Sequence, residues 1–256
     1  MSKKNIVIIT GASSGIGQEF AMQLDGILHK TDELWLIARR KNRLMELARL
    51  LDIPTKIIAM DMADKNDMRV FKKILEIEDV TIRMLINSAG FGIMGAFAEM
   101  DIDEQLAMLD VNCKALTEMT YYCIPYMQRN SRIIQIASSA GFLPQKNFAI
   151  YAASKSYVLS FSRALREELK PRKIWVTAVC PGPVETEFFD KAERTGSTLA
   201  IKKYTMVSVQ KVVKEALLDS RDKKAVSVCS FSIKSFRILA KMMPHSWLLG
   251  ISNLLK

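Results

Sequence analysis

Cysteine and histidine are scarce in this 256-residue sequence, and their scarcity limits the kinds of site that it can carry. The four cysteines show no Cys-x-x-Cys spacing, and most of them lie inside or beside apolar runs. This pattern predicts free, buried thiols in a reducing compartment and argues against a disulfide scaffold. The two histidines lie away from any cysteine pair, so we expect no zinc or other metal site.

Long apolar runs are also absent. No stretch reaches the roughly 18 consecutive apolar residues of a membrane-spanning helix, and no apolar signal segment precedes the first strand-like run. We therefore expect a cytoplasmic protein. Its composition, with 49% hydrophobic and 25% charged residues, is ordinary for a globular chain of one large α/β domain or two small ones.

Acidic residues are missing from the C-terminal end, where the chain concentrates much of its net charge of +10. The charged residues after Asp222 are Lys223, Lys224, Lys234, Arg237, Lys241 and Lys256. A basic cluster can serve nucleic acid, an anionic membrane surface or an anionic cofactor. No nucleic-acid-binding motif accompanies this one, so we expect no nucleic-acid partner.

Short apolar runs alternate with amphipathic segments along the chain. The runs predict strands at residues 5–10, 34–38, 56–60, 84–87, 132–137, 173–180 and 225–229. Helical spacing predicts helices at residues 18–24, 42–51, 103–130 (with a break near Pro125), 151–170 and 208–219, the last capped by Ser208. With no linker and no internal repeat, this alternation predicts one α/β domain over residues 1–230, a Rossmann-like, doubly wound parallel sheet flanked by helices. We expect residues 231–256 to pack on or near the same domain as a C-terminal extension.

A glycine-rich turn joins the first strand to the first helix, with the sequence Thr-Gly-Ala-Ser-Ser-Gly-Ile-Gly at residues 10–17. Gly11 allows a tight turn, Gly15 lets the backbone approach a pyrophosphate, and Gly17 permits close packing of helix on strand. The helix N-terminus adds free N–H groups and partial positive charge. A simple turn is the alternative, but the strand-loop-helix order favours a dinucleotide-phosphate site.

The second strand ends in arginines rather than in an acid. A site for NAD would place an acid roughly 20 residues past the glycines, for the ribose 2′-hydroxyl. Arg39 stands there and suits a 2′-phosphate, so the sequence favours NADP(H) over NAD(H), with Arg40 as a weaker candidate. Both could instead be solvated residues that open the next helix. Asp61, after the third strand, is placed to meet an adenine edge or to cap the following helix.

Two further strand ends carry small or helix-breaking residues. Asn-Ser-Ala-Gly at residues 87–90 would let a ligand approach the backbone. Pro-Gly-Pro-Val-Glu-Thr at residues 181–186 ends regular structure after the sixth strand. Residues 185–207 lack clean periodicity, and we expect a mobile lid over the substrate there. In a parallel sheet the carboxyl ends of the strands share one edge, where ligands bind.

Tyr151 and Lys155 lie four residues apart on a predicted helix, so their side chains should project from the same face, one turn apart. A phenol titrates near about pH 10, and a neighbouring ammonium would lower its pKa and let Tyr151 trade a proton near neutral pH. Solvated helices also carry this spacing without any function. Asn112, inside an apolar helix, would need hydrogen-bond partners if buried, as an ordinary core amide does.

Together these segments resemble the short-chain dehydrogenase/reductases over about residues 5–230. Residues 10–17 are similar to the family's cofactor loop, and residues 87–90 are similar to its Asn-Asn-Ala-Gly, with serine in second place. Residues 181–186 resemble its Pro-Gly-x-Val-x-Thr, which implies that Thr186 holds the nicotinamide carboxamide. The expected cofactor contacts are Gly11, Ser13, Ser14, Gly15, Ile16, Gly17, Arg39, Asp61, Asn87, Ala89, Gly90, Tyr151, Lys155, Pro181, Gly182, Val184 and Thr186.

Asn112, Ser138, Tyr151 and Lys155 match the family's catalytic tetrad, and the spacing from Ser138 to Tyr151 fits. The resemblance implies that Tyr151 exchanges the proton of the substrate oxygen, while Lys155 lowers the pKa of Tyr151 and holds the nicotinamide ribose. Ser138 would hydrogen-bond the carbonyl, with Ser139 as the alternative donor. Asn112 would hold a water in a proton relay with Lys155.

The resemblance therefore implies an NADP-dependent oxidoreductase that transfers hydride between NADP(H) and a carbonyl or secondary alcohol, in the reducing direction. A catalytically idle, NADP-binding regulatory protein on the same fold is the alternative, although the intact tetrad favours the enzyme. Family members are often dimers or tetramers that pack the tyrosine helix against its copy, so we expect a homo-oligomer.

The C-terminal extension carries two amphipathic stripes with basic residues between them. The first comprises Phe236, Leu239, Ala240 and Met243, and the second spans residues 247–255. Such a pattern is typical of a helix on a membrane surface, but we favour a flap over an apolar pocket or an oligomer contact. Each interpretation implies apolar surroundings, and hence an apolar ketone or alcohol such as a steroid or an acyl chain.

Overall fold

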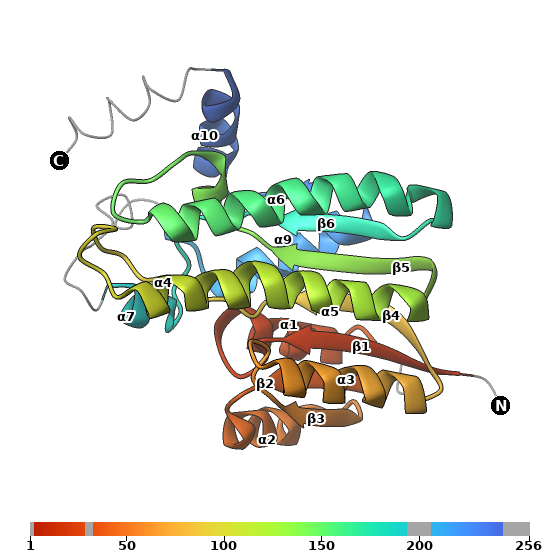
Figure 1. Cartoon of the computed structure of the whole chain (residues 1–256). Coiled ribbons are helices and arrows are strands. Elements are labelled where there is room, and N and C mark those ends of the chain that lie inside the picture. Colours follow the sequence, from red (N-terminus) through yellow and green to blue (C-terminus); the bar gives the residue numbers. More distant parts are fainter. Residues whose placement is uncertain (1–2, 29–32, 194–205, 243–256) are drawn as a thin grey trace.

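The computed structural model describes residues 3–28, 33–193 and 206–242 (Figure 1). Its seven strands form one sheet in the order β3-β2-β1-β4-β5-β6-β7, with every pair parallel. The strands are β1 (Lys4–Thr10), β2 (Glu33–Ala38), β3 (Thr55–Ala59), β4 (Val80–Asn87), β5 (Met127–Ile136), β6 (Trp175–Val179) and β7 (Val226–Ser227). This order confirms the predicted doubly wound sheet, in which the chain builds outward from β1 to β3 and then outward again from β4.

Helices cover both faces of the sheet (Figure 1). One face carries α1 (Gly15–Asp25), α2 (Lys41–Arg49) and α9 (Val209–Arg221), and the other carries α3 (Lys65–Ile77), α5 (Leu116–Cys123) and α6 (Ala149–Leu169). The remaining elements are α4 (Ile102–Leu109), a π-helical segment (Asp110–Ala115), α7 (Phe188–Ala192), α10 (Phe231–Met242) and 3₁₀ turns at Ile124–Tyr126, Ser139–Phe142 and Lys170–Arg172. None of the helices in the described residues is long and apolar enough to cross a membrane.

Strand β1 lies at the centre of the core and packs helices on both of its faces. Ile6 and Ile8 belong to the cluster that holds α3, α5 and α6, whereas Val7 and Ile9 belong to the cluster that holds α1, α2 and α9. All four side chains are fully buried. A strand that is buried on both faces has no need of polar residues at alternate positions, which explains its unbroken β-branched sequence.

The strand order reverses between β1 and β4, and the ends of these two strands are tied together. Thr10 pairs with Asn87 at the carboxyl ends of the strands. The Thr10 hydroxyl accepts hydrogen bonds from the backbone N–H groups of Ser88 and Ala89, both at 3.1 Å. Such a reversal opens the crevice in which doubly wound sheets bind their ligands.

The segment at residues 103–130 is not helical to its end, so that part of the prediction is wrong. The predicted break near Pro125 is confirmed, because α5 passes there into a 3₁₀ turn. Strand β5 then begins at Met127, which pairs with Ile82 of β4. This long-range pairing overrides the local helical pattern at Met127, and the chain passes through Asn130, with a positive φ of 70°, before its pairing with β4 resumes at Arg132.

Two helix starts differ from the prediction. Asp64, rather than Asp61, caps α3 by accepting hydrogen bonds from two backbone N–H groups of its first turn. The Asp61 carboxylate accepts instead from the N–H of Ala63, within the turn before the helix. Ser208 precedes α9, but its side chain makes no capping hydrogen bond, and the helix continues two residues past the predicted end to Arg221.

The four cysteines are free thiols, as predicted. Cys123 and Cys180 are buried, whereas Cys113 and Cys229 are partly buried. Burial raises the pKa of all four thiols, so they stay protonated at neutral pH.

Candidate active site

A cavity of about 560 Å³ opens at the carboxyl ends of the strands. It brings together most of the residues that the sequence assigns to the site. These are Gly11, Ser13, Ser14, Gly15, Ile16, Arg39, Asp61, Ala89, Gly90, Ser138, Tyr151, Lys155, Pro181, Gly182, Val184 and Thr186. An apolar pocket with a few convergent polar groups, placed at a switch point of the sheet, is the usual form of a small-molecule site.

The glycine-rich turn forms a cradle that leaves no room for side chains. Gly11 has a φ of 67°, in the left-handed region, and a Cβ atom there would lie 2.8 Å from the Cα of Ala89. A Cβ atom on Gly17 would lie 2.4 Å from the carbonyl oxygen of Gly11. Ser14 stands at the N-cap of α1 without a side-chain hydrogen bond to the helix, which leaves the first N–H groups to face an anion. The cradle fits the pyrophosphate of a dinucleotide.

Gly17 and Asn87 support the cavity without lining it. The Asn87 side chain is buried, and its amide donates to the side chains of Thr120 and Gln135, both at 2.9 Å. These bonds hold the end of β4 from inside the core. The direct contact with a cofactor that we expected of the Asn87 side chain is therefore not favoured by its position.

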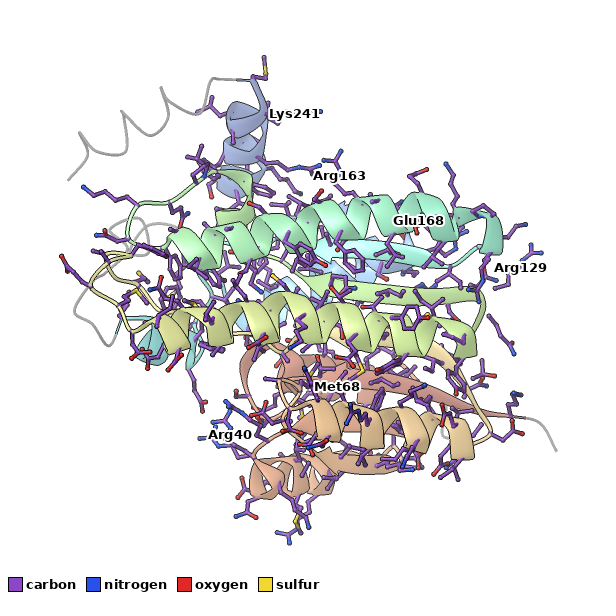
Figure 2. All side chains as sticks on the ribbon, in the orientation of Figure 1. Arg40, Met68, Arg129, Arg163, Glu168 and Lys241 are labelled. Carbon is purple, nitrogen blue, oxygen red and sulfur yellow. The ribbon has the colours of Figure 1, made fainter. Side chains whose placement is uncertain are left out.

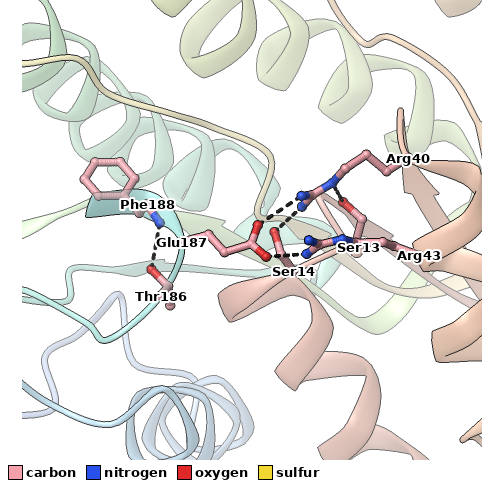
Figure 3. Close-up of polar contacts among 7 residues, drawn as sticks. All are labelled: Ser13, Ser14, Arg40, Arg43, Thr186, Glu187 and Phe188. Carbon is pink, nitrogen blue, oxygen red and sulfur yellow. Dashed lines mark hydrogen bonds and ion pairs between the residues drawn. The ribbon is translucent and has the colours of Figure 1, made fainter. Parts of the chain in front are cut away.

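Two arginines follow β2, and they turn in different directions. The Arg39 guanidinium lies 3.7 Å from the carboxylate of Asp61, and its side chain is 66% exposed. Arg40 instead faces the glycine-rich turn, where it donates to the hydroxyls of Ser13 (3.2 Å) and Ser14 (2.6 Å) (Figure 3). Arg40, which the sequence made the weaker candidate for binding the 2′-phosphate, is thus the arginine that contacts the predicted phosphate loop.

A third arginine, Arg43, was not predicted from the sequence. Together with Arg40 it forms a cationic corner at the end of β2. Arg43 lies on the first turn of α2 and forms an ion pair with Glu187, which also pairs with Arg40 at 3.0 Å (Figure 3). The spacing of three residues between Arg40 and Arg43 is the available signal, because it places them on one side of a helix. Nothing local indicates Glu187, which lies 144 residues further along the chain than Arg43.

Tyr151 and Lys155 are both buried, one turn apart on α6. The Lys155 Nζ donates to the carbonyl oxygen of Ile136 at 2.9 Å and lies 5.7 Å from the centre of the Tyr151 ring. Burial lowers the pKa of Lys155 to about 8 and raises the pKa of Tyr151 to about 12. The pKa of the phenol is thus raised rather than lowered, because desolvation is the larger cause and the hydrogen bond with Ser138 offsets it only in part.

Ser138 lies just past the end of β5, before the 3₁₀ turn Ser139–Phe142 and beside the phenol of Tyr151. Its side chain hydrogen-bonds that of Tyr151, which partly offsets the rise in the pKa of Tyr151. It also accepts a hydrogen bond from the N–H of Ala140 at 3.1 Å. Ser139 lines the cavity too, but its N–H is engaged by the carbonyl of Pro181 at 2.8 Å. These contacts place Ser138, rather than Ser139, next to Tyr151.

Asn112 lies in the π-helical segment, fully buried and fully engaged. Its Oδ1 accepts from the N–H of Phe91 at 3.0 Å, and its Nδ2 donates to the carbonyl of Phe91 at 2.9 Å. It thus clamps the loop after β4. A Cβ atom on Gly90 would lie 2.9 Å from the Asn112 Oδ1 and 3.4 Å from the Lys155 Nζ, so the amide and the ammonium flank the same glycine.

Ser154 links Asn112 to helix α6, and it was not among the residues predicted from the sequence. Its hydroxyl accepts from the Nδ2 of Asn112 at 3.1 Å and donates to the carbonyl of Tyr151 at 2.7 Å. The side chain is 1% exposed. The sequence indicates Ser154 only through its place between Tyr151 and Lys155, on the buried face of an amphipathic helix. Its partner Asn112 lies 42 residues away and leaves no local pattern.

Aromatic side chains surround Tyr151, and they were not predicted from the sequence. Phe148 stacks on the Tyr151 ring at a centroid distance of 4.2 Å, and Phe188 lies 5.4 Å from it. Ile233 and Phe236 of α10 line the same cavity. Phe188 belongs to the predicted lid, whose residues 194–205 lie outside the described residues, as do residues 243–256 of the extension.

The chain was compared with known proteins. A family model described as short chain dehydrogenase matches residues 5–196. The probable short-chain type dehydrogenase/reductase VdlC of Helicobacter pylori is 31% identical over 224 residues, which cover 85% of this chain and 80% of that protein.

Solved structures share the fold over most of the chain. The short-chain dehydrogenase from Sphingobium yanoikuyae in complex with NADPH has a TM-score of 0.77 and 26% identity, covering 94% of this chain and 96% of that one. The bulky-bulky ketone specific alcohol dehydrogenase from Comamonas testosteroni has a TM-score of 0.72 and 27% identity, with 93% and 94% covered. A short chain dehydrogenase/reductase from Burkholderia phymatum in complex with NAD has a TM-score of 0.80, with 93% and 92% covered. At 18% identity, that last likeness concerns the fold alone.

Proposed function

The chain belongs to the short-chain dehydrogenase family, and from this membership we propose that it transfers hydride between NADP(H) and the carbonyl or secondary-alcohol group of an apolar substrate. It is an oxidoreductase that uses a nicotinamide cofactor. The observation that carries the proposal is the place of Tyr151, whose side chain is hydrogen-bonded to Ser138 in the same cavity as the glycine cradle.

The residues of this chain divide the work of binding. The turn at residues 11–17 and the N-terminus of α1 would hold the pyrophosphate, and residues 181–186 would hold the nicotinamide end. When bound, the nicotinamide supplies the hydride for reduction or accepts it in oxidation. The aromatic residues around Tyr151 keep water from the reacting carbon.

Tyr151 handles the proton of the substrate oxygen. Burial, which raises the pKa of Tyr151 to about 12, keeps the phenol protonated at neutral pH, the state in which it donates to a developing alkoxide. Ser138 orients the carbonyl through its hydroxyl. Lys155, with a pKa lowered to about 8, can release a proton near neutral pH and would resupply Tyr151.

Replacing Tyr151 by phenylalanine separates this enzyme from the alternative, a regulatory protein that only binds the cofactor. We expect turnover to be lost and the dissociation constant for NADPH to stay within about twofold, because the ring packing is kept. Tyr157→Phe, on the same helix but 42% exposed, is the matched control and should keep its activity. NADPH binding by a wild-type protein that reduces no carbonyl in a broad panel would favour the regulatory alternative.

The preference for NADP(H) rests on the cationic corner at the end of β2. Arg39, Arg40 and Arg43 follow β2 closely in the sequence, where NAD sites carry an acid. Arg40 and Arg43 meet at Glu187, whereas Arg39 pairs with Asp61. The NADPH complex of the Sphingobium relative supports the same cofactor. Titration with NADPH and NADH, followed by nicotinamide fluorescence, tests the preference, and tighter binding of NADH would contradict it.

An apolar ketone or alcohol is the proposed substrate class, because Phe148, Phe188, Ile233 and Phe236 line the cavity beside Tyr151. The bulky ketones named for the Comamonas enzyme, which is 27% identical, are consistent with this class. A panel of carbonyl compounds should show faster reduction of bulky aryl or alicyclic ketones than of small polar ones. Reaction of small polar carbonyls alone would contradict the proposal.

We also propose a homodimer or homotetramer in which α5 and α6 pack against their copies. Tyr121 on α5 is 73% exposed, and Tyr157 on α6 is 42% exposed and stacked on Phe161 at 5.8 Å. Light scattering on a sizing column measures the mass directly. A mass equal to one chain at micromolar concentration would contradict the proposal.

Ile233 and Phe236 of α10 line the cavity, which supports the flap that the sequence favours, and we propose a peripheral contact with an anionic membrane surface as a second role for the exposed side of α10. The buried residues of α10 are Ile233 and Ala240, whereas Phe231 and Met242 are exposed. The basic residues Lys234, Arg237 and Lys241 are also exposed, and Figure 2 shows Lys241 near the end of this helix. Flotation with vesicles of anionic lipid should carry the protein, whereas zwitterionic vesicles should not. If the same amount of protein floats in a sample without lipid, the flotation does not come from vesicle binding, which would contradict the contact.

A further inference from the structure

The Glu187 carboxylate lies between two arginines at the phosphate end of the cradle, and we propose that it competes internally with the 2′-phosphate of NADP(H). The inference rests on the proposed function. It assigns Glu187 as a residue that sets cofactor specificity from the side of the substrate lid. Neither the family's cofactor motifs nor the tetrad includes this residue.

The contacts of Glu187 show what its carboxylate replaces. Arg40 donates to one carboxylate oxygen at 3.0 Å, and Arg43 donates to the other (Figure 3). The same Arg40 guanidinium bonds the hydroxyls of Ser13 and Ser14 in the cofactor loop. Guanidinium groups bind carboxylates and phosphates through the same planar fork of donors. The N–H groups that bond Glu187 are not free for a cofactor phosphate while these ion pairs last.

Glu187 is ionised at neutral pH. Hydrogen bonds from Arg43 and Arg40 hold its pKa below the usual range of a glutamate. Its side chain is 46% exposed, so water can replace the arginines when an anionic ligand arrives. The ion pairs are therefore strong enough to bias the arginines and weak enough to be displaced.

The position of Glu187 in the chain links this exchange to the substrate end of the site. It directly follows Thr186, which lines the cavity, and directly precedes Phe188, whose ring lies 5.4 Å from that of Tyr151. With Glu187 paired, residues 186–188 are fastened to the corner at the end of β2. A 2′-phosphate that takes the arginines releases this fastening, whereas NAD(H), which has no such phosphate, leaves it in place.

Because of this competition, the apparent affinity for NADP(H) is the intrinsic affinity multiplied by the fraction of molecules in which the arginines are free. If Glu187 is paired in roughly four fifths of the molecules, its removal should tighten NADPH binding about fivefold. The affinity for NADH should change by less than about twofold, because its binding does not require the same donors.

Calorimetric titration of Glu187→Gln with NADPH, NADH and adenosine 2′,5′-bisphosphate tests the inference. The bisphosphate carries the 2′-phosphate without the nicotinamide, so it isolates the cationic corner. We expect tighter binding of NADPH and of the bisphosphate, and an unchanged affinity for NADH. Glu185→Gln is the matched control, because Glu185 is exposed in the same segment and carries the same charge. Its substitution should change all three affinities by less than about twofold.

Two results would overturn the inference. An unchanged NADPH affinity in Glu187→Gln would mean that the carboxylate does not occupy the phosphate position. Equal tightening in Glu187→Gln and Glu185→Gln, or equal tightening for NADPH and NADH, would show a general effect of charge or of the lid. Failure of the proposed function looks different, since the wild-type protein would then bind neither NADPH nor NADH.

Discussion

Replacing Ser154 by alanine should lower the free energy of unfolding by about 2 kcal/mol. The Ser154 hydroxyl is buried and makes two hydrogen bonds, to the carbonyl of Tyr151 at 2.7 Å and from the amide of Asn112 at 3.1 Å. A buried hydrogen bond contributes about 1 kcal/mol net. The substitution removes a single oxygen atom, so the cavity it leaves adds little. The expected loss is therefore close to the sum of the two bonds.

Ser162 supplies the matched control on the same helix. It is also 1% exposed, but its hydroxyl makes one hydrogen bond rather than two, to the carbonyl of Val158 at 2.6 Å. Ser162→Ala should therefore cost about 1 kcal/mol, half the cost of Ser154→Ala. Urea denaturation, followed by circular dichroism, measures both losses under the same conditions.

A double-mutant cycle with Asn112→Ala isolates the bond between the two elements. We expect a coupling energy of about 1 kcal/mol between Ser154 and Asn112, and a value near zero between Ser162 and Asn112. If Ser154→Ala costs no more than Ser162→Ala, or if the coupling with Asn112 vanishes, the link between the π-helical segment and the catalytic helix contributes nothing to stability.

Three other changes test the site. Burial lowers the pKa of Lys155 from 10.5 to about 8, so the unfolded chain binds more protons than the folded one between these two pH values. The free energy of unfolding should therefore rise as the pH is raised across this interval, by at most about 3 kcal/mol. Denaturation of Lys155→Met across that interval should lack this rise, and an identical pH dependence would contradict the assignment. In Gly92→Ala, the added Cβ would lie 2.7 Å from the Cδ2 of Tyr151, so kcat should fall by up to about a hundredfold with unchanged NADPH binding; an unchanged kcat in steady-state assays would refute this displacement. Arg40→Ala should weaken NADPH binding at least about tenfold and NADH binding little, and calorimetry that finds equal losses would argue against a phosphate contact.

The sheet could be predicted from the sequence because its signals are local. A β-branched run such as Ile6–Ile9 needs burial on both faces, and helices between such runs imply a parallel sheet. The glycine-rich turn was equally readable, because Gly11 and Gly17 are required by contacts close in sequence or at the adjoining strand end. The extent of β5 was not readable, since its first residue, Met127, joins the strand by pairing with Ile82 of β4, which is distant in the sequence.

The sequence predicted most of the residues that line the cavity together, but not the electrostatics there. The spacing of Tyr151 and Lys155 placed them on one face of a helix, yet the direction of their pKa shifts depends on burial by distant segments. Likewise, the choice between Arg39 and Arg40 depends on Glu187, which lies 147 residues beyond Arg40. No periodicity encodes such a partner, because long-range side-chain pairing leaves no pattern in the neighbouring sequence.

The clamp formed by Asn112 has a consequence for how the molecule acquires its activity. Its bonds to Phe91 and Ser154 bridge 21 and 42 residues, and the Arg40–Glu187 pair bridges 147. Contacts between distant residues form slowly, because the intervening chain must first be closed into a loop. During refolding, far-ultraviolet circular dichroism should therefore recover before catalytic turnover does. A partly refolded sample would hold molecules with most of their secondary structure but without the long-range contacts of Asn112 and Glu187.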